Sequence, residues 1–168
     1  MIQKIINEVE DSSDIILDIV NQLVDNYCGP LDKCMLEFKT ILDNSSYPPT
    51  DQQLEDMVLR LPNLLYFTGE AVESLGIKSD IAEAIKMELY NEIHLQTEGT
   101  VAVRQAAAEL ETQEQKLVQI SYQRAYKKIK LRMEAGYEML TSIKKVLSRR
   151  MIELQLTYES HGGKVYEP

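Results

Sequence analysis

The chain has 168 residues, of which 44% are hydrophobic and 27% are charged, a composition typical of a folded protein rather than a disordered one. Its net charge of −9 conceals an asymmetry, because residues 1–115 carry 7 Lys and Arg against 22 Asp and Glu, whereas residues 116–151 carry 10 against 2. No apolar run approaches the ~18 residues of a membrane span, and the first residues lack the apolar stretch of a signal peptide. We therefore expect a cytoplasmic protein.

The sequence contains no recognisable catalytic or metal-binding motif. Cys28 and Cys34 are separated by five residues, which is neither a metal nor a redox spacing, so we predict two reduced, partly buried thiols. His94 and His161 have no Cys or carboxylate partner at a catalytic spacing. No phosphate-binding loop, nucleophile elbow or zinc-protease motif occurs. We predict a protein that is not an enzyme and that uses no cofactor, metal or small-molecule substrate.

Apolar spacing predicts an all-α fold that begins with four or five short helices. Turn and capping residues set the expected breaks. The first helix is expected to break, or a second one to be capped, at the polar cluster 11–14, and the chain should turn at Gly29-Pro30. A loop is expected at 44–49, followed by a helix that begins after Thr50 and kinks or ends at Pro62. Further helix ends are expected near Gly76 and at 97–100. Within the predicted helix 80–96, Ile81, Ile85, Leu89 and Ile93 follow one another at steps of four. No strand-like alternation appears.

A single long helix is predicted from residue 101 to about residue 158, because this stretch has no Pro and only one Gly. Within it, residues at alternating steps of four and three form a heptad series. We call this series the seam: Tyr122, Tyr126, Ile129, Met133, Gly136, Leu140, Ile143, Leu147, Arg150 and Leu154. A helix of this length would extend on the order of 85 Å, more than one small domain can cover, so we expect other copies of the chain to cover part of the seam.

The predicted organisation therefore has three parts: an acidic N-terminal helical domain (1–99), a long basic amphipathic helix (100–158) that joins copies into a bundle or ring, and a flexible tail (159–168). The apolar and aromatic seam residues would form the contacts between copies. Arg150, a cation within the seam, is expected to fix register or oligomer number, or alternatively to line a pore or groove.

Two basic clusters lie on the predicted long helix. The first consists of Arg124, Lys127, Lys128, Lys130 and Arg132, and the second of Lys144, Lys145, Arg149 and Arg150. Cations spaced along a helix suit the phosphates of a nucleic acid, and Tyr122 and Tyr126 could stack on unpaired bases. Alternatively, the clusters are solvated or face acidic surfaces of the same assembly, and the two tyrosines pack in the seam.

The stretches YKKIKLRMEA (126–135) and MLTSIKKVLSRRM (139–151) resemble helical recombination and replication accessory proteins of bacteriophages, with the UvsY-like recombination mediators as the nearest comparison. The resemblance implies an oligomeric protein that binds single-stranded DNA and helps to load a RecA-like recombinase onto DNA coated by single-strand-binding protein. The two basic clusters would then contact phosphates. Two other functions stay open: a protein–protein adaptor or inhibitor that acts through the acidic N-terminal surface, and a structural component of a larger particle.

Overall fold

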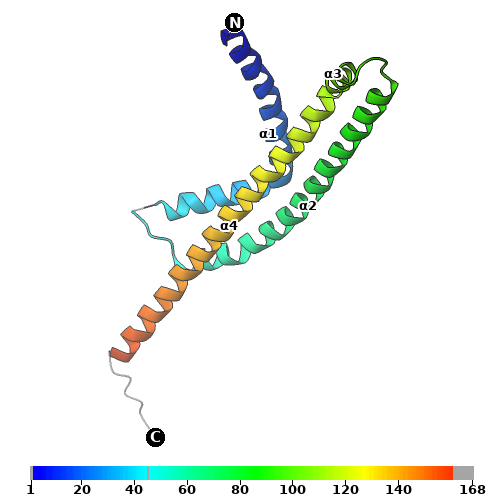
Figure 1. Cartoon of the computed structure of the whole chain (residues 1–168). Coiled ribbons are helices and arrows are strands. Elements are labelled where there is room, and N and C mark those ends of the chain that lie inside the picture. Colours follow the sequence, from blue (N-terminus) through cyan, green and yellow to red (C-terminus); the bar gives the residue numbers. More distant parts are fainter. Residues whose placement is uncertain (1, 45, 161–168) are drawn as a thin grey trace. The chain divides into compact units, whose positions relative to one another are not determined.

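The computed structural model describes residues 2–44 and 46–160, without the side chains of residues 2–9, 11, 12, 159 and 160. It contains the helices α1 (Ile2–Leu42), α2 (Asp51–Gln96), α3 (Val101–Glu111) and α4 (Gln113–Ser160), and no strand occurs among the described residues (Figure 1). The predicted all-α class is confirmed. Of the predicted tail, residues 161–168 lie outside the described part.

The N-terminal helices are longer than predicted. α1 continues through Pro30, and α2 continues through Pro62 and Gly76, so the prediction of several short helices was wrong. A proline inside a helix removes one backbone hydrogen bond and costs about 3 kcal/mol. Burial offsets this cost here, because Leu31 and Leu61, the immediate neighbours of the two prolines, are fully buried. Packing of apolar side chains therefore overrides the local signals.

Two predicted breaks are confirmed. Before α2, the backbone N–H of Gln53 donates to Thr50 Oγ1 at 3.2 Å, and that of Thr50 donates to Gln53 Oε1 at 2.9 Å. This reciprocal pair is a capping box, which satisfies two donors that a helix start leaves unpaired. After α2, Gly99 has a φ of +123°, a conformation that favours glycine.

The long C-terminal helix is confirmed in part, because Thr112 separates α3 from α4. The Thr112 hydroxyl donates to the carbonyl of Ala108 at 2.8 Å, and its backbone N–H donates to the same oxygen at 3.2 Å. Threonine hydroxyls that bond to the preceding turn compete with regular helix geometry. α4 itself is one helix of 48 residues.

The chain forms two compact units, and α1, α2 and α4 each contribute to both. Unit 1 comprises Met1–Gly29 and Thr68–Arg132, and unit 2 comprises Pro30–Phe67 and Met133–Pro168. Each unit therefore combines an acidic N-terminal part with a basic part of α4. This division differs from the predicted boundary between residues 99 and 100, because the long helices extend through both units.

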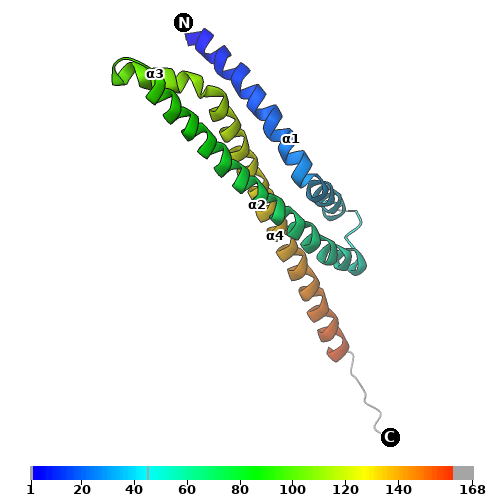
Figure 2. The same cartoon turned by 90° about the vertical axis from the view of Figure 1, so that its right-hand side faces the viewer.

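In unit 1, α2 and α4 lie side by side and are joined through α3 (Figures 1 and 2). The fully buried side chains include Val24 of α1, Leu75 of α2 and Ile129 of α4. The ring of Tyr126 lies 3.6 Å from the position that a Cβ atom on Gly76 would occupy. The missing side chain therefore leaves room for the tyrosine of α4 to pack on α2.

Unit 2 has a core of the same kind, made by α1, α2 and α4. Its buried apolar residues are Leu31, Cys34, Phe38, Leu54, Met57, Leu61, Leu65, Leu140 and Ile143. A Cβ atom on Gly136 would lie 2.8 Å from Leu65 Cδ2 and 3.7 Å from Met35 Sδ. At Gly136, α4 therefore approaches side chains of both α1 and α2 so closely that there is no room for a Cβ atom next to Leu65.

Most of the seam is covered by the chain itself. Ile129, Gly136, Leu140 and Ile143 are buried, Tyr122, Tyr126, Met133, Leu147 and Arg150 are half-buried, and only Leu154 is exposed. The long helices α1 and α2 supply the side chains that cover the buried part of the seam. The expectation that other copies cover part of the seam stays a prediction, as does association of copies through another surface.

Candidate nucleic-acid interface

The first basic cluster lies on the unit 1 part of α4. Arg124, Lys127 and Lys130 are exposed and make no ion pair or hydrogen bond with any described residue. Lys128 is half-buried, and its Nζ donates to Asn21 Oδ1 at 2.7 Å. Arg132 is half-buried and already engaged. Three of the five predicted cations are therefore available to a ligand.

The second basic cluster lies on α4 in unit 2. Lys144 and Lys145 are exposed, and within the described ranges neither has an acidic or hydrogen-bonding partner. Arg149 is also exposed, and its Nε donates to Glu153 Oε1, one turn away, at 2.8 Å. Exposed pairs of this kind contribute little free energy, so Arg149 can exchange its carboxylate for another anion.

Arg150 has a structural role in unit 2. Its Nη1 donates to the backbone carbonyl of Pro49 at 2.8 Å and to Asp51 Oδ1 at 2.7 Å. Pro49 lies just before α2 and Asp51 is its first residue, so the guanidinium ties α4 to the N-terminus of that helix. The sequence placed Arg150 in a contact between copies, but the structure gives it partners inside the chain. Like Lys128 and Arg132, it is half-buried and already engaged.

The predicted stacking residues are poorly placed for bases, because Tyr122 and Tyr126 are half-buried in unit 1. The structure instead exposes Tyr137, at 51% of its surface, on the unit 2 part of α4. Tyr137 precedes Lys144 by seven residues, so the two side chains lie on the same face of the helix. Tyr137 is not among the residues predicted from the sequence, although its spacing from Lys144 was a signal that could have identified it.

The hydroxyl groups on this face are tied to the backbone. Thr141 Oγ1 donates to the carbonyl of Tyr137 at 2.9 Å, and Ser148 Oγ donates to that of Lys144 at 2.9 Å. They therefore add little to recognition. We call the solvent-exposed surface that carries Tyr137, Lys144, Lys145 and Arg149 the basic face of unit 2.

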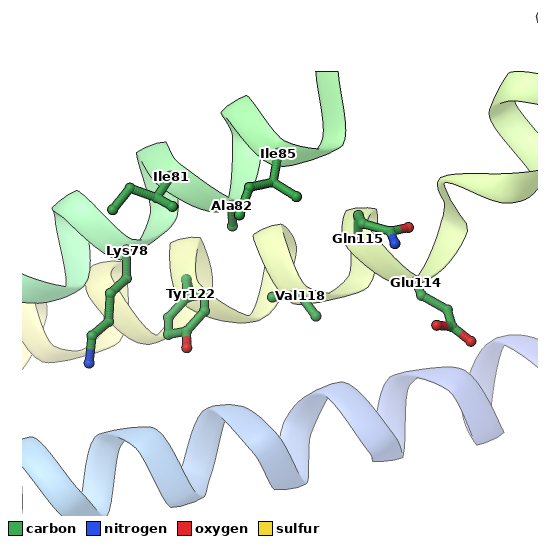
Figure 3. Close-up of a pocket in the computed structure, with 8 residues that line it drawn as sticks. All are labelled: Lys78, Ile81, Ala82, Ile85, Glu114, Gln115, Val118 and Tyr122. Atoms are coloured by element: carbon green, nitrogen blue, oxygen red, sulfur yellow. The ribbon is translucent and has the colours of Figure 1, made fainter. Parts of the chain in front are cut away.

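Unit 1 has an apolar groove of about 370 Å³ between α2 and α4 (Figure 3). Ile81 and Ile85, which the sequence places on one helix face, are each 53% exposed there and face Val118 of α4. Lys78 and Glu114 lie at opposite ends of the groove in Figure 3. Lys78 Nζ donates to Tyr27 Oη at 2.6 Å, and this hydrogen bond raises the pKa of the lysine.

The two cysteines are both buried, and neither forms a disulfide. Burial raises the pKa of the Cys34 thiol, and the nearby Arg60 guanidinium opposes this shift only in part. A buried thiol with a raised pKa is a poor nucleophile.

These features define the class of the chain: an all-α protein of two helical units with an exposed basic face on α4. No family model, curated protein or solved structure matches it. The resemblance to the UvsY-like mediators therefore rests on the residue pattern of α4 alone. Among the described residues, no helix is both long and apolar enough to cross a membrane.

Proposed function

We propose that the chain is a cytoplasmic accessory protein of phage-type recombination or replication, which binds single-stranded nucleic acid on the basic face of unit 2 and acts beside a RecA-like recombinase or a single-strand-binding protein. One observation carries this proposal. Lys144 and Lys145 are exposed and have no described acidic partner, and the exposed Tyr137 lies two turns before them on the same helix.

Phosphate binding depends on whether a lysine is free of carboxylate partners. A lysine that already pairs with a carboxylate gains little from a phosphate, whereas a solvated lysine gains the full counterion release. On a single strand each phosphate contact adds about 0.7 to the dependence of log affinity on log salt concentration. Lys144 and Lys145 meet this condition, and Arg149 meets it once Glu153 is displaced.

Tyr137 would give the protein a preference for single strands over duplexes. With a rise of ~1.5 Å per residue, Lys144 and Lys145 lie roughly 10–12 Å along the helix from Tyr137. A strand whose phosphates meet the lysines can place a neighbouring base on the tyrosine ring. Stacking on an aromatic side chain contributes about 1–3 kcal/mol per base, and only unpaired bases can provide it.

The lysines are tested by fluorescence anisotropy with a labelled oligothymidine at low salt. The variant Lys144→Gln/Lys145→Gln should bind markedly more weakly than the wild type. The matched control Lys39→Gln/Lys116→Gln also removes two positive charges, but from exposed positions of α1 and α4 that lie outside the basic face. If both double variants weaken binding equally, only net charge matters, and if the wild type never binds, the proposal is wrong.

The tyrosine is tested in the same assay. Tyr137→Ala should lower affinity for the single strand by about 1–3 kcal/mol, or roughly 5-fold to 150-fold, and leave affinity for a duplex of equal length nearly unchanged. Tyr137→Phe should retain the wild-type affinity. Tyr47→Ala, at an exposed loop position of unit 2, is the control. An equal loss with single strand and duplex would exclude stacking.

A second candidate function, that of a protein–protein adaptor or inhibitor, is favoured by the apolar groove of Figure 3. Its exposed isoleucines and its oppositely charged ends suit the apolar face of a partner helix that carries a carboxylate near Lys78 and a cation near Glu114. In this case Ile81→Asp/Ile85→Asp should abolish the function in a complementation assay while oligothymidine binding persists. Loss of function with Lys144→Gln/Lys145→Gln alone would favour the first proposal.

A further inference from the structure

A second groove in unit 1, of about 600 Å³, lies between α1 and α4. Its apolar lining includes Leu17 of α1 and Leu131 of α4, which are 52% and 65% exposed. Its remaining apolar lining residues are Ile16, Val20 and Ile120. Three cations of α4 also line it: Arg124, Lys127 and Lys128. Apolar side chains this exposed, on a groove rather than scattered, mark a surface that binds another molecule.

The groove's own lining contains no carboxylate, but α1 carries an acidic stripe beside its lining residues Ser13 and Leu17. Asp14, Asp18 and Asp25 are exposed on α1, and with Asn21 they follow helical spacing along one stripe. Asn21 accepts the hydrogen bond from Lys128 Nζ, which shows that this stripe and the cations of α4 belong to the same face of unit 1. In the described part of the chain, no ion pair joins the two rows.

Three acidic residues on one side and three cations on the other exclude a ligand whose charges all have the same sign. A nucleic acid in the groove would meet the carboxylates of α1, and a uniformly acidic helix would meet them too. A uniformly basic helix would meet the cations of α4. Like charges placed opposite each other across an interface cost several kcal/mol. The occupant must carry an acidic row and a basic row on either side of an apolar strip.

The chain itself has such a surface. A two-fold axis that lies in the plane of this face and runs along the groove would place the acidic row of each copy against the basic row of the other, with the apolar strips in contact. From this charge pattern we infer that unit 1 associates with unit 1 of a second copy through the groove between α1 and α4. The first basic cluster then serves self-association, whereas the proposed nucleic-acid binding uses unit 2.

Charge reversal tests this inference on the full chain. An acid-reversed variant, Asp14→Lys/Asp18→Lys, makes both rows basic, and a base-reversed variant, Arg124→Glu/Lys127→Glu, makes both rows acidic. Lys128 is left intact because it bonds to Asn21. The measurement is analytical ultracentrifugation over roughly a hundredfold range of concentration. The wild type should dimerise as its concentration rises, because mass action governs the equilibrium. Each variant should stay a monomer, because like charges would then face each other.

An equimolar mixture of the two variants is the decisive sample. Each copy then presents the charge that the other lacks, so the mixture should form a heterodimer with an affinity near that of the wild type. Circular dichroism of each variant establishes that it is folded, and Lys144→Gln/Lys145→Gln should dimerise normally. A wild type that stays monomeric, or a dimer that either reversed variant leaves unchanged, overturns the inference without touching the nucleic-acid proposal. A failure of the folded variants to restore each other's assembly also overturns it.

Discussion

Replacement of Gly136 by alanine tests whether α4 is covered by the chain's own helices. The new methyl group would lie 2.8 Å from Leu65 Cδ2, closer than side-chain carbons can approach, and 3.7 Å from Met35 Sδ. Leu65 is fully buried, so it has little room to move. Overpacking of a core costs typically 1–3 kcal/mol, whereas alanine gains about 1 kcal/mol over glycine inside a helix. We expect Gly136→Ala to lower the free energy of unfolding by about 0–2 kcal/mol.

Gly76→Ala is the matched control, since its nearest neighbour, a ring carbon of Tyr126, would lie 3.6 Å from the new Cβ atom, an ordinary contact. Here the helix gain is unopposed, and the free energy of unfolding should rise by about 0.5–1 kcal/mol. Urea unfolding followed by circular dichroism at 222 nm measures both differences. Circular dichroism at this wavelength follows the helix content, so the protein needs no label.

The opposite signs of the two changes carry the test. If Gly136→Ala stabilises the chain as much as Gly76→Ala does, then α2 does not cover α4 at this point, and the seam is free for another copy. A double-mutant cycle adds a second check. Leu65→Ala alone should cost about 2–5 kcal/mol, and less in the presence of Gly136→Ala, because the added methyl group fills part of the cavity.

Three further predictions concern unit 2. Arg150→Gln should lower the free energy of unfolding by about 1–2 kcal/mol, because this side chain is 30% exposed and its guanidinium bonds to Pro49 and Asp51. The control Arg149→Gln, at an 82% exposed position, should change the free energy of unfolding by less than about 0.5 kcal/mol. Equal effects in urea unfolding would contradict the assignment. Thr50→Ala should lower the free energy of unfolding by about 0.5–2 kcal/mol, because the capping box is lost. The helix signal should then disappear at a lower urea concentration, and an unchanged midpoint of urea unfolding would argue against the cap. The hydrogen bonds from Arg60 lower the pKa of Glu37, so the stabilisation that this pair gives is present above the ordinary pKa of a glutamic acid, about 4.3, and is lost as the pH falls through the lowered value. Glu37→Gln should therefore reduce the fall in stability on acidification, measured by thermal unfolding from neutral to acidic pH, and an unaltered pH profile would show that the pair is unimportant.

The fold class was predictable because the apolar spacing is helical throughout, but the lengths of the helices were not. Pro30 and Pro62 are local stop signals, and each is overridden by the burial of the leucine next to it, Leu31 or Leu61, in a core that helices distant in sequence complete. Conversely, the helix is interrupted at Thr112, in a stretch with no Pro or Gly nearby that the sequence predicts to be continuous. Single-residue signals are too weak, at a few kcal/mol, to decide against the packing of several apolar side chains.

The candidate site was predictable in its charges and less so in its aromatic residue. Lys144 and Lys145 are exposed, in accordance with their position on the polar side of α4. Arg150 and Tyr126 illustrate the limit, because both lie on a face that the sequence assigned to other copies and that contacts α2 instead. Which partner covers a helical stripe depends on chain topology, and periodicity gives only the existence of the stripe.

The salt dependence of oligothymidine binding tests the central claim most directly, namely that Lys144 and Lys145 contact phosphates. A plot of log affinity against log salt concentration should have a slope that is smaller by about 1.4 for Lys144→Gln/Lys145→Gln than for the wild type, because two phosphate contacts on a single strand are lost. The Lys39→Gln/Lys116→Gln control should keep the wild-type slope. A slope that is the same in all three proteins would contradict the account, since the two lysines would then release no counterions on binding.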